Sequence, residues 1–93
     1  MYVPYVGGEP ASVSINGHRM LILSQHEDVL ENSLGLFGAD HLQEVNIGET
    51  SEEQDFALDQ LASSAEAGVV VAPLDIEIQE VIRNLELELP WIH

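Results

Sequence analysis

The sequence predicts a small single α/β domain over residues 1–93, with a mixed, mostly parallel sheet of four or five strands flanked by helices. A strong hairpin signal lies near the N-terminus, and short apolar segments then alternate with helical patterns in the order βαβαβα. Such alternation is typical of parallel strands joined by right-handed crossovers. A chain of 93 residues with a hydrophobic fraction of 45% suits one core of ordinary composition.

Residues 1–10, MYVPYVGGEP, are expected to form either an edge strand or a flexible arm. Proline is tolerated at a sheet edge and not in a central strand, so Pro4 favours the edge. If the segment is an arm beside Gly7-Gly8, then Tyr2 and Tyr5 are candidate partner-binding residues.

Residues 12–23 are predicted to form a β-hairpin. Asn16-Gly17 is a strong two-residue turn signal, because both turn positions require positive φ. The return strand, residues 20–23, is continuously apolar, which indicates a strand covered on both faces.

A helix is expected next, opened by a capping box at Ser24-Gln25-His26-Glu27 and ended by Gly38. A strand over residues 42–47 follows. A second capping box, Thr50 to Glu53, opens another helix, which we expect to end at Gly68. Its predicted inner face consists of Phe56, Ala57, Leu61 and Ala65.

Val69 to Ala72 are predicted to form a short buried strand. Residues 76–89 match both a strand alternation and a helical stripe of Ile78, Ile82, Leu85 and Leu89, and the helix is favoured because it fits throughout. One conflict remains: the hairpin partner and two parallel neighbours would compete for the two edges of the 20–23 strand.

Charge is the outlying property of the chain. It has 17 Asp and Glu against two cations, Arg19 and Arg83, and a formal net charge of −15. Affinity for phosphate backbones comes from Lys and Arg, so direct nucleic-acid binding is excluded. Three explanations stay open: a solvated face, adaptation to a high-salt cytoplasm, or a partner with a basic surface.

Several classes of protein are disfavoured. No window holds the roughly 18 apolar residues of a membrane helix, and the N-terminus lacks the features of a signal peptide. A cytoplasmic location and no membrane partner are therefore expected. Without Cys or Lys, thiolate, Schiff-base and P-loop chemistry are excluded.

Ligands of open α/β sheets bind beyond the carboxyl ends of the strands. The loops at that edge carry His26, Asp28, Glu49 and Asp75. This set suits Mg²⁺ or Ca²⁺, or carboxylate–imidazole acid–base work. The favoured interpretation is structural, with no cofactor: Ser24, Thr50 and Asp75 each stand where a helix N-cap is needed.

The sequence thus favours a non-catalytic acidic module that regulates or binds a protein partner, with a basic surface as the expected target. The alternative is a small-ligand or divalent-metal-dependent enzyme that uses the loop carboxylates. A third hypothesis is a homo-oligomeric subunit that associates through a sheet edge or the apolar tail. In that tail, Trp91 and Ile92 are further candidate partner-binding residues.

Overall fold

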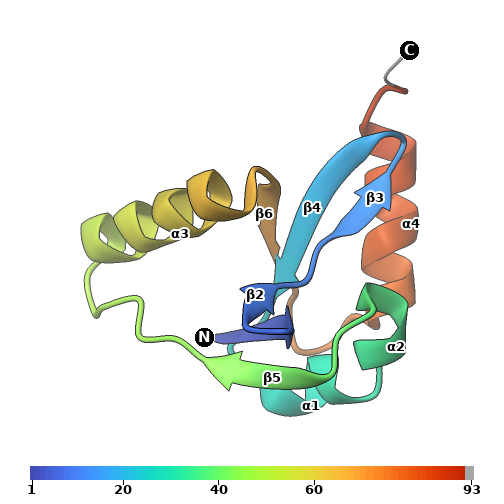
Figure 1. The fold of residues 1–93 in the computed structure, drawn as a ribbon. Helices are drawn as coiled ribbons and strands as arrows, with labels where there is room; N and C mark the ends of the chain where they lie inside the picture. Colours follow the sequence, from blue (N-terminus) through green and yellow to red (C-terminus); the bar gives the residue numbers. More distant parts are fainter. Residues whose placement is uncertain (92–93) are drawn as a thin grey trace.

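The computed structural model describes residues 1–91 and shows a small mixed α/β arrangement of two three-stranded sheets with four helices (Figure 1). The strands are β1 (Tyr2–Val6), β2 (Glu9–Pro10), β3 (Val13–Ile15), β4 (His18–Leu23), β5 (His41–Glu44) and β6 (Gly68–Val71). The helices are α1 (Glu27–Glu31), α2 (Leu34–Phe37), α3 (Ser51–Ala65) and α4 (Ile78–Glu88). The strand orders are β2-β1-β5 and β3-β4-β6.

Strand β4 is buried on both faces, as its continuous apolar run predicts. Met20 and Ile22 belong to the core cluster that contains the buried residues of α4. Leu21 and Leu23, which alternate with them, belong to a second cluster with Val3 of β1. The two helices α4 and α3 accordingly lie on opposite sides of this strand (Figure 1).

The predicted mostly parallel sheet is wrong. A strand has two hydrogen-bonding edges, and those of β4 are occupied by β3, antiparallel, and β6, parallel. Strand β5 therefore pairs antiparallel with β1 in the other sheet, so only the β4–β6 pair is parallel. Of the three strands that were expected to compete for the two edges of the 20–23 strand, β5 is the one that does not pair with it.

The expectation that the first strand lies at a sheet edge is also wrong, because β1 is the middle strand of its sheet and the short strand β2 lies at the edge. Gly7 and Gly8 have φ of 57° and 85° and form the tight turn into β2. The Val45 N–H donates to the Met1 carbonyl at 2.7 Å. By alternation, the Pro4 nitrogen points away from β5. Proline is tolerated here because its missing N–H costs no β1–β5 hydrogen bond.

The predicted β3–β4 hairpin is confirmed, with positive φ at Asn16 and Gly17. Its turn also holds the end of α4. The Asn16 side-chain amide donates to the carbonyls of Glu86 (2.8 Å) and Leu89 (2.7 Å). The His18 ring is 2.7 Å from the Pro90 carbonyl.

The predicted helix after β4 is shorter and divided into α1 and α2. Ser24 does not cap it, because its backbone pairs with Tyr2 in an extended bridge. Its buried hydroxyl accepts from the His26 N–H at 3.1 Å. The helix therefore starts at Glu27, with His26 at the N-cap position. Gly38 ends α2 with φ of 64°, as predicted.

Helix α3 begins as predicted but ends and packs differently. The Thr50 hydroxyl accepts from the Glu53 N–H at 3.2 Å. The helix ends at Ala65, and the residue that terminates it is Glu66, with φ of 52°, rather than Gly68. Gly68 instead permits close packing, because a Cβ there would lie 2.8 Å from the Met20 sulfur.

The inner face predicted for α3 is partly wrong. Leu58, Leu61 and Ala65 pack against the core, whereas Phe56 is 67% exposed. Phe56 lies two residues before Leu58, which is roughly 200° around the helix. Packing through Leu58 therefore turns Phe56 outward.

The helical interpretation of residues 76–89 is confirmed over Ile78–Glu88. Ile78, Val81 and Leu85 are buried in the cluster shared with Ile22, and Leu89 is partly buried against it. One apolar stripe thus fixes this helix on the sheet.

We expect Asn16→Asp to lower the free energy of unfolding by about 1–3 kcal/mol, because two partly buried backbone carbonyls lose their donor. The change also places a negative charge beside the C-terminal end of a helix dipole. Urea denaturation measures the loss. Asn84→Asp, at an exposed position of α4, is the control with the same charge change, and an equal loss there would contradict the role of Asn16.

Candidate functional site

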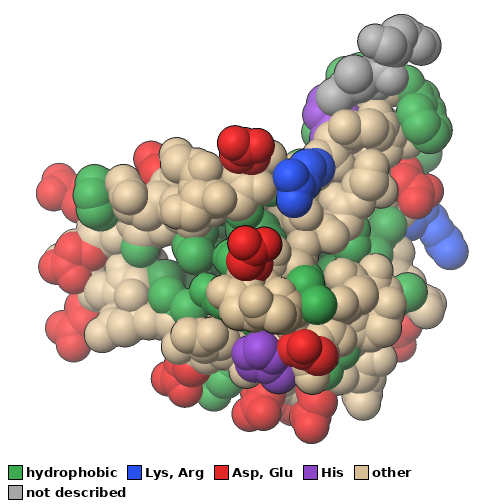
Figure 2. Space-filling model, viewed as in Figure 1, with side chains coloured by type: hydrophobic (Ala, Val, Ile, Leu, Met, Phe, Trp, Pro, Cys, Tyr) green, Lys and Arg blue, Asp and Glu red, His purple; other side chains and the backbone are tan. Residues whose placement is uncertain are grey.

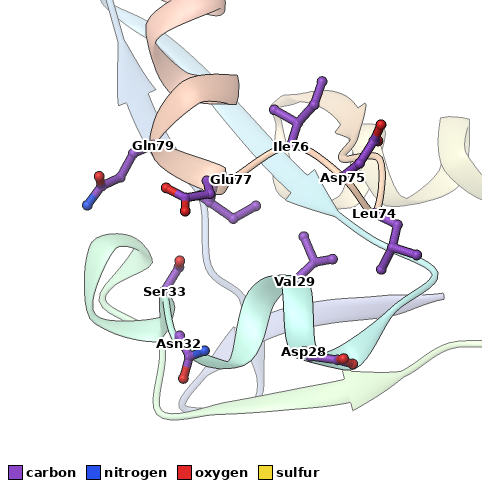
Figure 3. A pocket seen from close by; sticks show the side chains of 10 residues that line it. Asp28, Val29, Asn32, Ser33, Leu74, Asp75, Ile76, Glu77 and Gln79 are labelled. Atoms are coloured by element: carbon purple, nitrogen blue, oxygen red, sulfur yellow. The ribbon is translucent and has the colours of Figure 1, made fainter.

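Two of the predicted site residues, Asp28 and Asp75, line one open pocket of about 480 Å³ (Figure 3). One wall comes from α1 and the residues after it, and the other comes from the segment that leads into α4. The lining residues are Asp28, Val29, Asn32, Ser33, Leu74, Asp75, Ile76, Glu77, Ile78 and Gln79. Acidic and apolar side chains therefore share this pocket.

The topology explains why these two loops meet. Strands β4 and β6 are parallel, with Leu23 in register with Val71. Their carboxyl ends therefore lie at one edge of the sheet, and so do the segments that follow them. The predicted meeting of these two loops is thus present. The third loop follows β5, which belongs to the other sheet, and its Gly48 lines a different pocket with Gln25.

The structure does not bring the four predicted metal ligands together. His26 is exposed at the start of α1 and does not line the pocket. Glu49 precedes α3, where its N–H donates to the Glu53 carboxylate at 3.2 Å. In Figure 3 the Asp28 and Asp75 carboxylates point in different directions. Among residues 1–91, no three His, Asp or Glu side chains are grouped so that they could hold a metal ion.

Asp75 is not a helix cap, which corrects the favoured sequence interpretation. Helix α4 starts at Ile78 with Glu77 at the N-cap position, and no side chain accepts a hydrogen bond there. Asp75 lies in the preceding turn and is exposed. The helix starts later than predicted, at the first residue of its buried stripe, Ile78.

The candidate partner-binding residues fall in two different settings. Tyr2 and Tyr5 are partly buried in β1 and pack against the two core clusters. The charge of Glu44, followed by desolvation and the charge of Glu27, raises the pKa of Tyr2. Trp91 is 68% exposed, and Ile92 lies outside the described residues.

The acidic residues themselves form the most extensive polar feature. All 17 Asp and Glu are exposed. Within residues 1–91 the one contact between a carboxylate and a basic side chain at ion-pair distance is that of Asp40 with His41. It lies on the surface and is an ion pair only when His41 is protonated. In Figure 2, acidic side chains are spread over the visible face, and the arginine colour appears in the half that holds β4 and α4. The carboxylates are thus left free to attract an external cation.

Sequence reasoning missed a second hollow, between α3 and β6. It is about 420 Å³ and is lined by Asp55, Leu58, Asp59, Ala62, Val69 and Val71. In the sequence, Leu58, Leu61 and Ala65 recur at helical spacing, as the predicted inner face of this helix does. This second apolar stripe is the sequence signal that indicates the observed packing of α3. It would have placed Phe56 outside and Asp55 and Asp59 beside the strand.

Comparisons with protein-family models, with curated proteins and with solved structures found no match to this chain. Within the part of the chain that the structure describes, no helix has both the length and the apolar character needed to cross a membrane.

We expect Asp75→Ala to change the free energy of unfolding by less than about 0.5 kcal/mol, because the side chain is exposed and caps nothing. Thr50→Ala should cost about 1 kcal/mol, because it removes a cap that is present. Chemical denaturation of both variants checks the pair of values. A larger loss of stability for Asp75→Ala than for Thr50→Ala would contradict this prediction and indicate that Asp75 does cap a helix.

The hydrogen bond from His41 lowers the pKa of Asp40 below its ordinary value of 3.8. A carboxyl with a lowered folded pKa contributes stability above its unfolded pKa, and this contribution is lost as the pH falls through the folded pKa. We expect His41→Ala to raise the pKa of Asp40 towards 3.8, as measured by NMR titration of its carboxyl carbon. His26→Ala is the control and should leave the pKa of Asp40 unchanged.

Proposed function

We propose that this chain is a non-catalytic, cytoplasmic binding module that recognises a basic surface on a protein partner. The observation that carries the proposal is that every one of its 17 carboxylates is exposed, and that a single surface contact at ion-pair distance is formed within residues 1–91. Carboxylates without nearby cations produce a strong negative potential around a small protein.

The proposed partner is a protein and not a nucleic acid, because phosphates would be repelled by this surface. Complementary charge acts mainly on the rate of association and on specificity. Stable affinity additionally needs apolar anchors, and exposed apolar side chains are present at Phe56 and Trp91. The proposed interface therefore combines long-range attraction with a few apolar contacts.

Adaptation to high salt would explain the same charge, and it predicts different behaviour. A surface adapted to high salt should gain stability as salt rises, because screening relieves self-repulsion, and it would capture no partner at low salt. A module for a basic partner should bind at low salt and lose its partner as salt rises. Salt dependence therefore separates the two explanations.

The test is a tagged pull-down from the source lysate at about 0.05 M and about 0.5 M salt, followed by association kinetics with the purified captured protein. We expect a basic partner whose association rate falls by at least about tenfold over this range, since salt screens exposed charges. An empty bait at both salt concentrations, or an association rate that does not depend on salt, would contradict the proposal.

A further inference from the structure

We propose that the unpaired edge of β6, together with the groove between β6 and α3, binds an extended segment of the partner that carries basic residues at alternate positions. This inference rests on the proposed function, to which it adds a location and a binding mode. Three features carry it: the free strand edge, the apolar groove beside it, and the charge at its rim.

Strand β6 is the last strand of its sheet and pairs only with β4. The Ala72 N–H donates to the Leu23 carbonyl at 2.7 Å, so the backbone groups of Ala72 and Val70 face β4. By alternation, the N–H and C=O groups of Val69 and Val71 face away from β4. No backbone hydrogen bond from another described segment reaches them. Such an edge is a template for an added strand.

The groove beside this edge is apolar at its base. Leu58 and Ala62 of α3 face Val69 and Val71 of β6 across about 420 Å³. Val71 remains 41% exposed. None of the α3 residues is fully buried. An added strand would place every second side chain on the α3 side of the sheet, over this base.

The negative charge at the rim of the groove favours basic side chains in the bound segment. Asp55 and Asp59 line the groove one helical turn apart, both exposed, and neither forms an ion pair within the described part of the chain. Like charges at i and i+4 repel each other, and a bound cation would relieve this. A bound side chain must therefore cover the apolar base of the groove and bring a positive charge to the two carboxylates. Lys and Arg do both, because the aliphatic stem covers apolar surface while the charged end reaches the carboxylates.

The same charge argues against a second copy of this chain as the occupant. A copy that docked its own β6 edge here would bring a second Asp55 and Asp59 to the groove, on a molecule of net charge −15. The fitting occupant is therefore a different chain, extended and basic on one face, with apolar β-branched residues between the basic ones.

The probe is a fluorescent, end-blocked peptide of alternating Lys and Val, six residues long, titrated against the full chain at low salt. We expect the peptide to bind and to change the NMR chemical shifts of the Val69 and Val71 amide groups. Asp55→Asn/Asp59→Asn should weaken the affinity by about tenfold, which corresponds to two modest ion pairs. Asp28→Asn/Asp75→Asn is the matched control, because it removes the same charge at the pocket between α1 and the start of α4 and should leave the affinity within about twofold.

Two further peptides test the binding mode. A peptide with three Lys followed by three Val has the same composition and should bind at least about fivefold more weakly, because only the alternating order presents every basic side chain on one face. N-methylation of the alternating peptide at the residues that would pair with β6 should abolish binding, because it removes the donors.

The outcomes separate the two proposals. Equal loss from both double variants, or equal binding of both peptide orders, would overturn the strand-addition site while leaving an acidic module for a basic partner intact. If no Lys-containing peptide bound at low salt, the groove proposal would fail. If the pull-down also returned no basic partner, the proposed function would fail with it.

Discussion

The two edges and two faces of β4 determine the rest of the structure. Its edges accept β3 and β6 and exclude β5, which must find another partner. On one face, Met20 and Ile22 pack in the cluster that contains residues of α4. On the other face, Leu21 and Leu23 pack in the cluster that contains residues of α3. Burying four consecutive apolar residues in this way contributes on the order of 1.5–3 kcal/mol for each large side chain. The second sheet therefore forms around β1, which is the strand left free to pair with β5.

A chain with two cations must also stabilise helix ends without Lys or Arg. Helix α4 has no basic residue in its last turn, and Glu86 and Glu88 lie there. The hairpin turn substitutes for the missing cations, because the Asn16 amide donates to two of the terminal carbonyls. The sequence element that reverses the chain between β3 and β4 thus also joins the hairpin to the last helix.

The same scarcity of cations leaves the surface open to external charge. Acidic residues in the first turns of α1, α3 and α4 complement the helix dipoles. This local role explains some of the carboxylates, but Asp55 and Asp59 lie beyond the first turn of α3, beside the edge of β6. A helix that packs through few apolar residues leaves a groove, and in this molecule the groove, the free strand edge and the negative rim coincide.

The sequence by itself determined the features that depend on neighbours within about four residues. The Asn16-Gly17 turn, the Thr50 cap, the covered β4 strand and the helical stripe of residues 76–89 follow from local φ preference, capping and periodicity. Only the tertiary structure decided which strand pairs with β5, that Phe56 is exposed, and that Asp75 does not cap α4. These outcomes depend on competition between distant segments for one strand edge or one face, and no short-range pattern records which segment wins.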